Sequence, residues 1–276
     1  MAASMLSDYH THTPLCHHAV GLPVEYAAQA KAAGLAELGL SDHNPMPEQY
    51  DDWRMALSDF PTYLDMVEEA REVHPDLPIR LGLECDFLEG REDWIEEQSK
   101  MADFDYLIGS VHYVGGDFAV DDPKHLSRWR GEGAVEEIWQ RYWVLYEKMV
   151  RCRLFDFHGH PDLPKKFGLR PSGDLRRYYE PVIQALADTD GAIEVSTAGL
   201  RKECAELYPA QDFLSAACEA GVHIVISSDA HAPGEVGLQF DQALAAARAA
   251  GFTHSVRFNQ RARSLVPLPD SWPPSV

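Results

Sequence analysis

The chain has 276 residues, 45% of them apolar, and a formal net charge of −20 at pH 7. This length is typical of one β/α-barrel domain, and the negative charge disfavours binding to nucleic acid or to an anionic membrane surface. The five cysteines form no CxxC pair, no basic and apolar leader opens the chain, and no apolar run is long enough, at about 18 residues, to suggest a membrane span. We therefore expect a reduced, cytoplasmic protein, and the sequence leaves its oligomeric state open.

Short apolar runs alternate along the chain with longer segments of helical period. Seven runs are predicted to be strands and an eighth is possible; they cover residues 5–9, 36–40, 79–85, 106–111, 154–157, 192–195 and 223–227, with 255–258 as the eighth. Helices are predicted over residues 23–33, 134–151, 174–188, 211–220 and 235–250. This alternation predicts a parallel sheet, and seven or eight such units suit a TIM-barrel-like fold better than an open sheet.

The domain organisation that we expect is simple. Residues 1–266 are assigned to one α/β barrel domain, because no linker-like run divides them. Residues 267–276 contain four prolines and are expected to form an extended or partly disordered tail.

Nearly every predicted strand ends in residue types that bind metal ions. The ends read DYHTH at 8–12, SDHN at 41–44, GLECD at 82–86, GSVH at 109–112, DFHGH at 156–160, EVST at 194–197 and SSDAH at 227–231. In a parallel barrel all these ends lie on one face, where active sites are built, so residues distant in sequence converge there. Residues two apart in a strand point to the same side, so His10 and His12 can reach one ion together.

The ligand types favour a catalytic metal cluster. Burying many ionisable groups costs several kcal/mol each unless cations neutralise them. Imidazoles and carboxylates without thiolates suit Zn, Mn or Fe and argue against a closed structural zinc site. A carboxylate such as Glu84 can in addition bridge two ions, which a neutral imidazole cannot do.

These segments resemble the PHP (polymerase and histidinol phosphatase) family, and most of all its monofunctional histidinol-phosphate phosphatases. The resemblance lies in HTHT with a following histidine at 10–18, SDHNPMP at 41–47, GLECDF at 82–87, IGSVHY at 108–113, GHPDLPKKFG at 159–168, STAGLRK at 196–202 and SSDAH at 227–231. It implies a distorted seven-stranded (β/α)7 barrel that holds three divalent ions. It also implies hydrolysis of L-histidinol phosphate to L-histidinol and phosphate in histidine biosynthesis, with a metal-activated hydroxide as the nucleophile.

The resemblance implies a ligand set, residue by residue. One ion is given to His10, His12, Glu84 and Asp229, a second to Glu84, His112 and His160, and a third to His18, His43 and His231. His17 is also present, so the choice between His17 and His18 stays open.

Further roles are assigned as hypotheses. Glu84, Asp229 and His231 are expected to take part in catalysis, together with Asp42, which we expect to orient His43 or a neighbour. Arg201 and Lys165 are our candidates for binding the phosphoryl group, because cationic side chains match its oxygens. Asp86 is interpreted as a hydrogen-bonding support, His158 as a supporting or packing residue and Cys16 as an ordinary small residue.

Two other functions remain open at this point. A different phosphatase on the same scaffold would act on another small phosphomonoester, and a non-catalytic metal-binding protein is the alternative from another class. A proofreading exonuclease needs a basic DNA channel, which a chain this acidic does not favour. The expected partner is therefore a small-molecule phosphomonoester, with neither nucleic acid nor membrane.

Overall fold

Seven parallel strands form one sheet in the computed structural model, which describes residues 6–273. The strands follow chain order and are β1 (Ser7–Asp8), β2 (Glu37–Leu40), β3 (Ile79–Asp86), β4 (Tyr106–Ser110), β5 (Phe157–His158), β6 (Ala192–Ser196) and β7 (His223–Ser227). The segments after β7 and β1 also meet: His12 N–H donates to Ala230 O at 2.9 Å, and Ala230 N–H to His10 O at 3.1 Å. The sheet therefore curls into a barrel, which confirms the predicted fold class.

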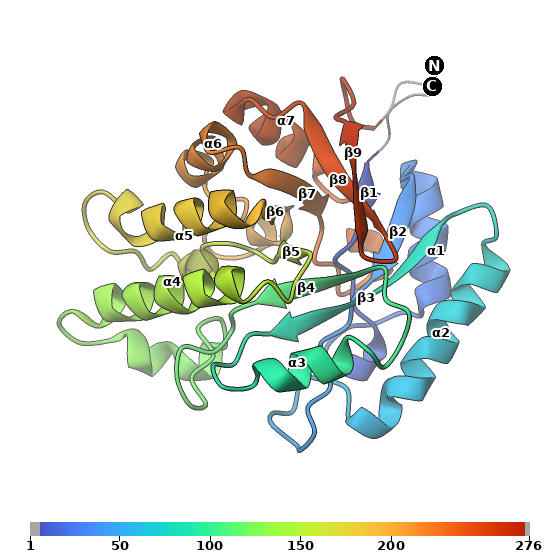
Figure 1. The fold of residues 1–276 in the computed structure, drawn as a ribbon, viewed down its shortest axis with the longest axis horizontal. Helices are drawn as coiled ribbons and strands as arrows, with labels where there is room; N and C mark the ends of the chain where they lie inside the picture. Colours follow the sequence, from blue (N-terminus) through green and yellow to red (C-terminus); the bar gives the residue numbers. More distant parts are fainter. Residues whose placement is uncertain (1–5, 274–276) are drawn as a thin grey trace.

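Helices cover the outside of the barrel (Figure 1). They are α1 (Pro23–Ala33), α2 (Phe60–Val73), α3 (Glu92–Gln98), α4 (Ala134–Cys152), α5 (Arg176–Thr189), α6 (Gln211–Glu219) and α7 (Phe240–Ala250). α1 has its predicted bounds, with Pro23 at its first position and Gly34 closing it in the left-handed conformation at φ +78°. α2 was not predicted, although Phe60, Tyr63 and Val67 lie at helical spacing and are buried. Within residues 6–273 no helix has the length and apolar character needed to cross a bilayer.

The possible eighth strand exists, but it does not join the barrel sheet. β8 (His254–Asn259) pairs antiparallel with β9 (Ala262–Pro267) through a tight turn at Gln260 and Arg261. The ring of Phe258 lies 5.9 Å from that of Tyr9 and 5.6 Å from that of Phe157, at the amino-terminal ends of the strands. The hairpin therefore fills the end of the barrel opposite the strand carboxyl ends.

The predicted tail begins inside β9 and continues along α7. Leu268 is buried, and Arg248 of α7 donates to the carbonyl oxygens of Leu268 and Pro269. The ring of Trp272 lies 5.8 Å from that of Phe240. This segment is thus packed against the barrel as far as residue 273, and the rest of the predicted tail, residues 274–276, lies outside the described residues.

Candidate metal centre

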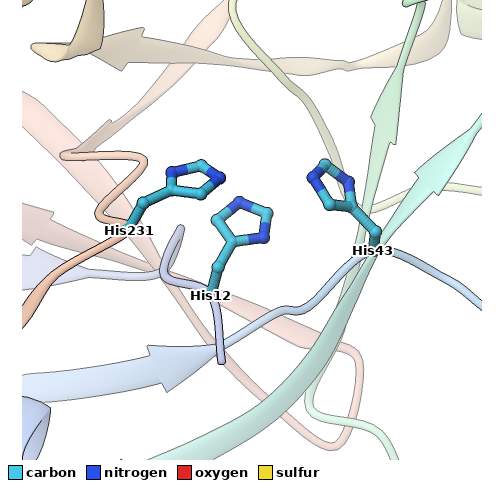
Figure 2. Close-up of side chains that lie close together, drawn as sticks. All are labelled: His12, His43 and His231. Carbon is cyan, nitrogen blue, oxygen red and sulfur yellow. The ribbon is translucent and has the colours of Figure 1, made fainter. Parts of the chain in front are cut away.

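Imidazole and carboxylate side chains converge at the carboxyl ends of the strands, as the barrel rule predicts. Figure 2 shows three of them, His12, His43 and His231, reaching toward one another from separate segments, and their donor atoms lie within 4.8 Å of one another. A cavity of about 460 Å³ opens beside them. The predicted ligands that line it are His18, His43, Glu84, His112, His160, Asp229 and His231.

Glu84, at the end of β3, lies between two groups of histidines. Its Oε2 is 2.8 Å from His43 Nδ1 and 3.3 Å from His10 Nε2. Its Oε1 is 2.9 Å from His160 Nε2 and 3.6 Å from His112 Nε2. The carboxylate is buried, and each oxygen faces different imidazoles, which is the arrangement that a bridging ligand requires.

The first two predicted ligand groups are each brought together. Donor atoms of His10, His12 and Asp229 lie within 4.8 Å of one another, and so do those of Glu84, His112 and His160. These groups come from five strand ends that are far apart in sequence, so the predicted convergence is present in the fold.

The third predicted group is also close, and the structure favours His18 over His17. The Nε2 atoms of His18 and His231 are 2.9 Å apart, and the His18 ring stacks 5.4 Å from that of His43. His17 is exposed, in a left-handed turn at φ +64°, and lines no part of this cavity. Cys16 lies nearer the centre than we expected, because its Sγ is within 4.8 Å of donor nitrogens of His18 and His231.

Unpaired nitrogens show that this donor set fits cations. Within the described chain, His10 Nε2 and His43 Nδ1 are buried and make no well-aligned hydrogen bond, although Glu84 Oε2 lies 3.3 Å and 2.8 Å from them. A buried polar atom without a partner is costly, whereas a nitrogen lone pair that coordinates a cation is satisfied. The pairing of imidazole with carboxylate suits divalent ions of the zinc, manganese and iron type.

The electrostatics of the site also favour positive charge. Burial acts to lower the pKa of His112, but the charges of Asp86 and Glu84 outweigh it and raise the pKa to about 10. Burial also acts to lower the pKa of His12, but the neighbouring carboxylates of Asp229 and Asp42 raise that pKa to about 9. For Glu84, burial favours the neutral form, but the surrounding imidazoles hold its pKa well below the ordinary value. The carboxylates therefore remain ionised and attract cations.

Two predicted supporting residues, Asp86 and Asp42, lie beside the Nδ1 atoms of proposed ligand histidines. Asp86 Oδ1 lies 2.8 Å from His112 Nδ1, which confirms the hydrogen-bonding support that we expected of it. Asp42 Oδ1 accepts the backbone N–H of His43 at 2.8 Å and lies 3.5 Å from His12 Nδ1, so its side chain faces the neighbour rather than the His43 ring. Such contacts fix which ring nitrogen is free to bind a metal.

Glu194 is a supporting residue to which sequence reasoning assigned no role. It lies in β6 and is fully buried. Its Oε1 is 2.8 Å from His10 Nδ1, and its Oε2 accepts the backbone N–H of His160 at 2.6 Å. The available signal was a single acid inside the apolar run AIEVS, on a strand that supplies no ligand of its own.

His158 turns away from the cluster. Its Nδ1 lies 2.9 Å from Ala192 O, and burial lowers its pKa to about 4. It is a packed, neutral core residue, in agreement with the interpretation made from the sequence.

The two predicted phosphate-binding residues do not reach the cavity. Lys165 is 1% exposed, and its Nζ bonds to Asp162 Oδ2 at 2.9 Å and to Leu207 O at 2.6 Å. Arg201 Nη2 donates to the carbonyl oxygens of Ser228 and Asp229, and its Nε pairs with Glu235 at 3.3 Å. The structure therefore gives no support to a direct role for either residue in binding phosphate.

The neighbouring lysines take their place beside the cavity. Lys166 and Lys202 both line it, and Lys166 Nζ lies 3.0 Å from Asp121 Oδ2. Lys165 and Lys166 lie in a 3-10 turn, where adjacent side chains point in different directions, so the sequence does not show which of them faces inward.

An aromatic wall and three acids complete the cavity. The Trp53 ring meets that of His43 edge-on at 4.5 Å and that of His112 at 5.4 Å. Asp52, Asp121 and Asp122 also line the cavity. The site thus combines the cluster of histidines and carboxylates that attracts cations with two lysines and three further aspartates along the cavity.

Taken with the barrel, this centre defines a metal-dependent hydrolase. The family model for the PHP domain matches residues 8–198, well over half of the chain, and the chain belongs to the PHP family.

Similar proteins share the fold and much of the sequence. The chain is 43% identical over 258 residues to a protein of Deinococcus radiodurans named probable histidinol-phosphatase, a match that covers 93% of this chain and 97% of that protein. It is 26% identical over 260 residues to the histidinol-phosphatase of Bacillus subtilis, covering 85% of this chain and 96% of the relative. Among solved structures, the histidinol phosphate phosphatase of Lactococcus lactis, complexed with zinc, L-histidinol and phosphate, superposes with a TM-score of 0.80 at 22% identity, covering 94% of this chain and 99% of that one.

Proposed function

We propose that the protein is a histidinol-phosphate phosphatase, which hydrolyses L-histidinol phosphate to L-histidinol and phosphate. The observation that carries this proposal is the position of Glu84 between two histidine groups at the mouth of a PHP barrel. The substrate is supported by the Deinococcus relative and by the ligands of the Lactococcus structure.

The ligand groups support a proposal of three divalent ions. We propose His10, His12, Glu84 and Asp229 for the first, Glu84, His112 and His160 for the second, and His18, His43 and His231 for the third. When bound, such ions supply a hydroxide nucleophile near neutral pH and offset charge on the phosphoryl oxygens. The zinc of the Lactococcus structure supports zinc as one occupant, and Mn and Fe suit the same donors.

The remaining cavity residues orient and hold the substrate. The ammonium groups of Lys166 and Lys202 attract the phosphoryl oxygens, in the place that we had given to Lys165 and Arg201. Trp53 provides an apolar wall beside the ligand rings and excludes water there.

The charge pattern of the cavity suits a substrate with both signs of charge. L-Histidinol phosphate carries an ammonium group and an imidazole beside its phosphate. The carboxylates of Asp52, Asp121 and Asp122 offer partners for those cationic groups, whereas a sugar phosphate has none to place there.

A substrate panel with the purified, zinc-loaded protein tests this function. Phosphate release is measured with L-histidinol phosphate, O-phosphoserine, glucose 6-phosphate and AMP at equal concentrations. We expect the highest kcat/KM with L-histidinol phosphate. A higher value with another compound would favour a different phosphatase, and no release from any of them would favour a non-catalytic metal-binding protein.

The expected cellular location and partners agree with this function. All five cysteines are unpaired, which supports the reducing environment of the cytoplasm. The net charge of −20 supports a small-molecule substrate rather than nucleic acid or an anionic membrane.

A further inference from the structure

Arg54 is a buried cation beside the site that the proposed mechanism does not use. It lies in the loop after β2, is 5% exposed, and is not among the residues that line the cavity. Its Nη1 donates to the backbone and side-chain oxygens of Asn44, each at 3.1 Å. Its Nε and Nη2 bond to Asp51, and Nη2 also reaches Asp86 Oδ2 at 2.8 Å. The guanidinium is therefore fixed on every side.

The contact with Asp86 connects Arg54 to a proposed metal ligand. Asp86 Oδ2 is held by Arg54, while Oδ1 of the same carboxylate lies 2.8 Å from His112 Nδ1. The backbone N–H of Asp86 donates to Asn44 Oδ1 at 3.1 Å, so the residue is anchored at both ends. Without the arginine, one oxygen of a carboxylate that is only 2% exposed would lose its partner, and the carboxylate could rotate away from His112.

The charges in this network are arranged to act on His112. One positive charge, on Arg54, faces two negative charges, on Asp51 and Asp86, which leaves one negative charge in excess. That excess lies against His112 Nδ1. An acceptor there keeps a proton on Nδ1, so Nε2 is the nitrogen that gives up its proton to bind an ion, and it lies 3.6 Å from Glu84 Oε1.

Arg54 touches the surroundings of His112 by a second route. Its guanidinium lies 4.6 Å from the centre of the Trp53 ring, and that ring meets His112 edge-on at 5.4 Å. Asp51, its other partner, also accepts the hydroxyl of Tyr113 at 2.7 Å, and Tyr113 stacks on Trp53 at 5.9 Å. One arginine thus supports both the carboxylate behind His112 and the aromatic wall beside it.

We infer that Arg54 is a positioning residue for the metal centre: it holds Asp86 so that His112 presents Nε2 to an ion. The inference depends on the proposed function only in taking His112 as a ligand. Arg54 touches neither the cavity nor a proposed ligand, so it acts through Asp86 and Trp53. Its role is therefore to set metal affinity at one position, and not to contact the substrate.

Zinc binding and the His112 tautomer together test this inference. Zn²⁺ affinity is measured by chelator competition on wild type, Arg54→Met and Arg54→Lys, and the His112 tautomer by ¹⁵N NMR of the zinc-saturated proteins. For Arg54→Met we expect about tenfold weaker binding of one Zn²⁺ equivalent, since loss of such indirect support costs roughly 10–100-fold. We also expect loss of the pure Nδ1–H form of His112, with Arg54→Lys intermediate because it keeps the charge but lacks the fork.

Arg80→Met is the matched control. Arg80 is also an ion-paired arginine, bonded to Glu37 at 2.9 Å, but it lies near the start of β3, away from the strand carboxyl ends. It should lower stability and leave zinc affinity and the His112 tautomer unchanged. A change in both variants alike would reduce Arg54 to a structural residue and overturn the inference.

Two further outcomes decide the matter. Wild-type zinc affinity and tautomer in folded Arg54→Met, or in Arg54→Lys if the first variant does not fold, would overturn the inference. In an Asp86→Asn background, the effect of Arg54→Met should largely disappear, and full additivity would contradict action through Asp86. Because zinc affinity and the tautomer are both read without substrate, a wild type that fails to hydrolyse L-histidinol phosphate would refute the proposed function and leave this result standing.

Discussion

Glu194 allows a sharp test of how the ligands are held, through the substitution Glu194→Gln. The two oxygens of Glu194 serve two donors, the Nδ1–H of His10 and the backbone N–H of His160. Glutamine has the same shape but only one side-chain oxygen, and its amide group is a donor. Whichever way the amide turns, one buried donor therefore faces another donor.

The size of the effect follows from that mismatch. An unsatisfied buried donor costs about 1–3 kcal/mol, and for a chain of this length ~2 kcal/mol corresponds to a fall in Tm of roughly 5 °C. If His10 instead moves its proton to Nε2, the lone pair that faces Glu84 is lost. Either way we expect binding of one Zn²⁺ equivalent to weaken by roughly 10–100-fold.

Thermal unfolding and chelator competition measure the two effects, with Glu37→Gln as the control. Glu37 is also a buried carboxylate with two donors, the Tyr9 hydroxyl at 2.7 Å and Arg80 Nε at 2.9 Å, but it contacts no proposed ligand. Both of these bonds reach the same oxygen, Oε2, so Glu37→Gln should lower Tm through the lost charge opposite Arg80 and leave zinc affinity intact. Unchanged zinc affinity in Glu194→Gln would refute the reasoning, and so would an equal loss of affinity in both variants.

Three more outcomes are expected. Glu84→Gln should weaken Zn²⁺ binding about 100-fold, because the carboxylate charge that faces both histidine groups is lost. If chelator competition showed unchanged zinc affinity and turnover were also unchanged, Glu84 would not bridge the ions. Lys166→Met should lower kcat/KM for L-histidinol phosphate about tenfold. Lys165→Met should leave kcat/KM nearly intact but lower the free energy of unfolding by about 3 kcal/mol, because Asp162 loses its ion-pair partner. The reverse pattern would support Lys165 as the phosphate-binding residue. The pKa of His158 is about 4 in the folded chain and 6.5 ordinarily, so as the pH falls the unfolded chain takes up the proton first. The free energy of unfolding should therefore fall by ~3 kcal/mol between pH 6.5 and pH 4. Urea titrations should show that His158→Asn removes this part of the pH dependence, and an unchanged pH dependence would show that the ring is not buried in its neutral form.

The strand ends could be predicted from the sequence because two regular features coincide there. Side chains alternate along a strand, and all carboxyl ends of a parallel barrel share one face. Those features place His10, Glu84 and Asp229 near one another before any coordinates are seen. They do not show which strand acid binds an ion and which supports a ligand, and for that reason Glu194 was assigned no role.

Local pattern alone does not determine the partner of a strand or of a charged side chain. β8 has the alternation of a strand, but that pattern is the same whether its neighbour is a barrel strand or the other arm of a hairpin. In the pair Lys165 and Lys166, charge alone does not show which ammonium enters the cavity and which pairs with Asp162. The prolines after residue 266 predicted an extended or partly disordered tail, and in the structure Leu268 is buried and Trp272 packs on Phe240 of α7.

The hairpin of β8 and β9 limits the routes by which ions and substrate reach the metal centre. Phe258 packs against Tyr9 and Phe157 and closes the end of the barrel opposite the metal centre. Ions, substrate and both products therefore enter and leave through the cavity at the carboxyl ends of the strands. We therefore expect metal ions to load before the substrate, since a bound phosphoester would lie between the cavity opening and the ligands. An apoenzyme incubated with substrate before zinc should consequently show a lag that the opposite order of addition abolishes.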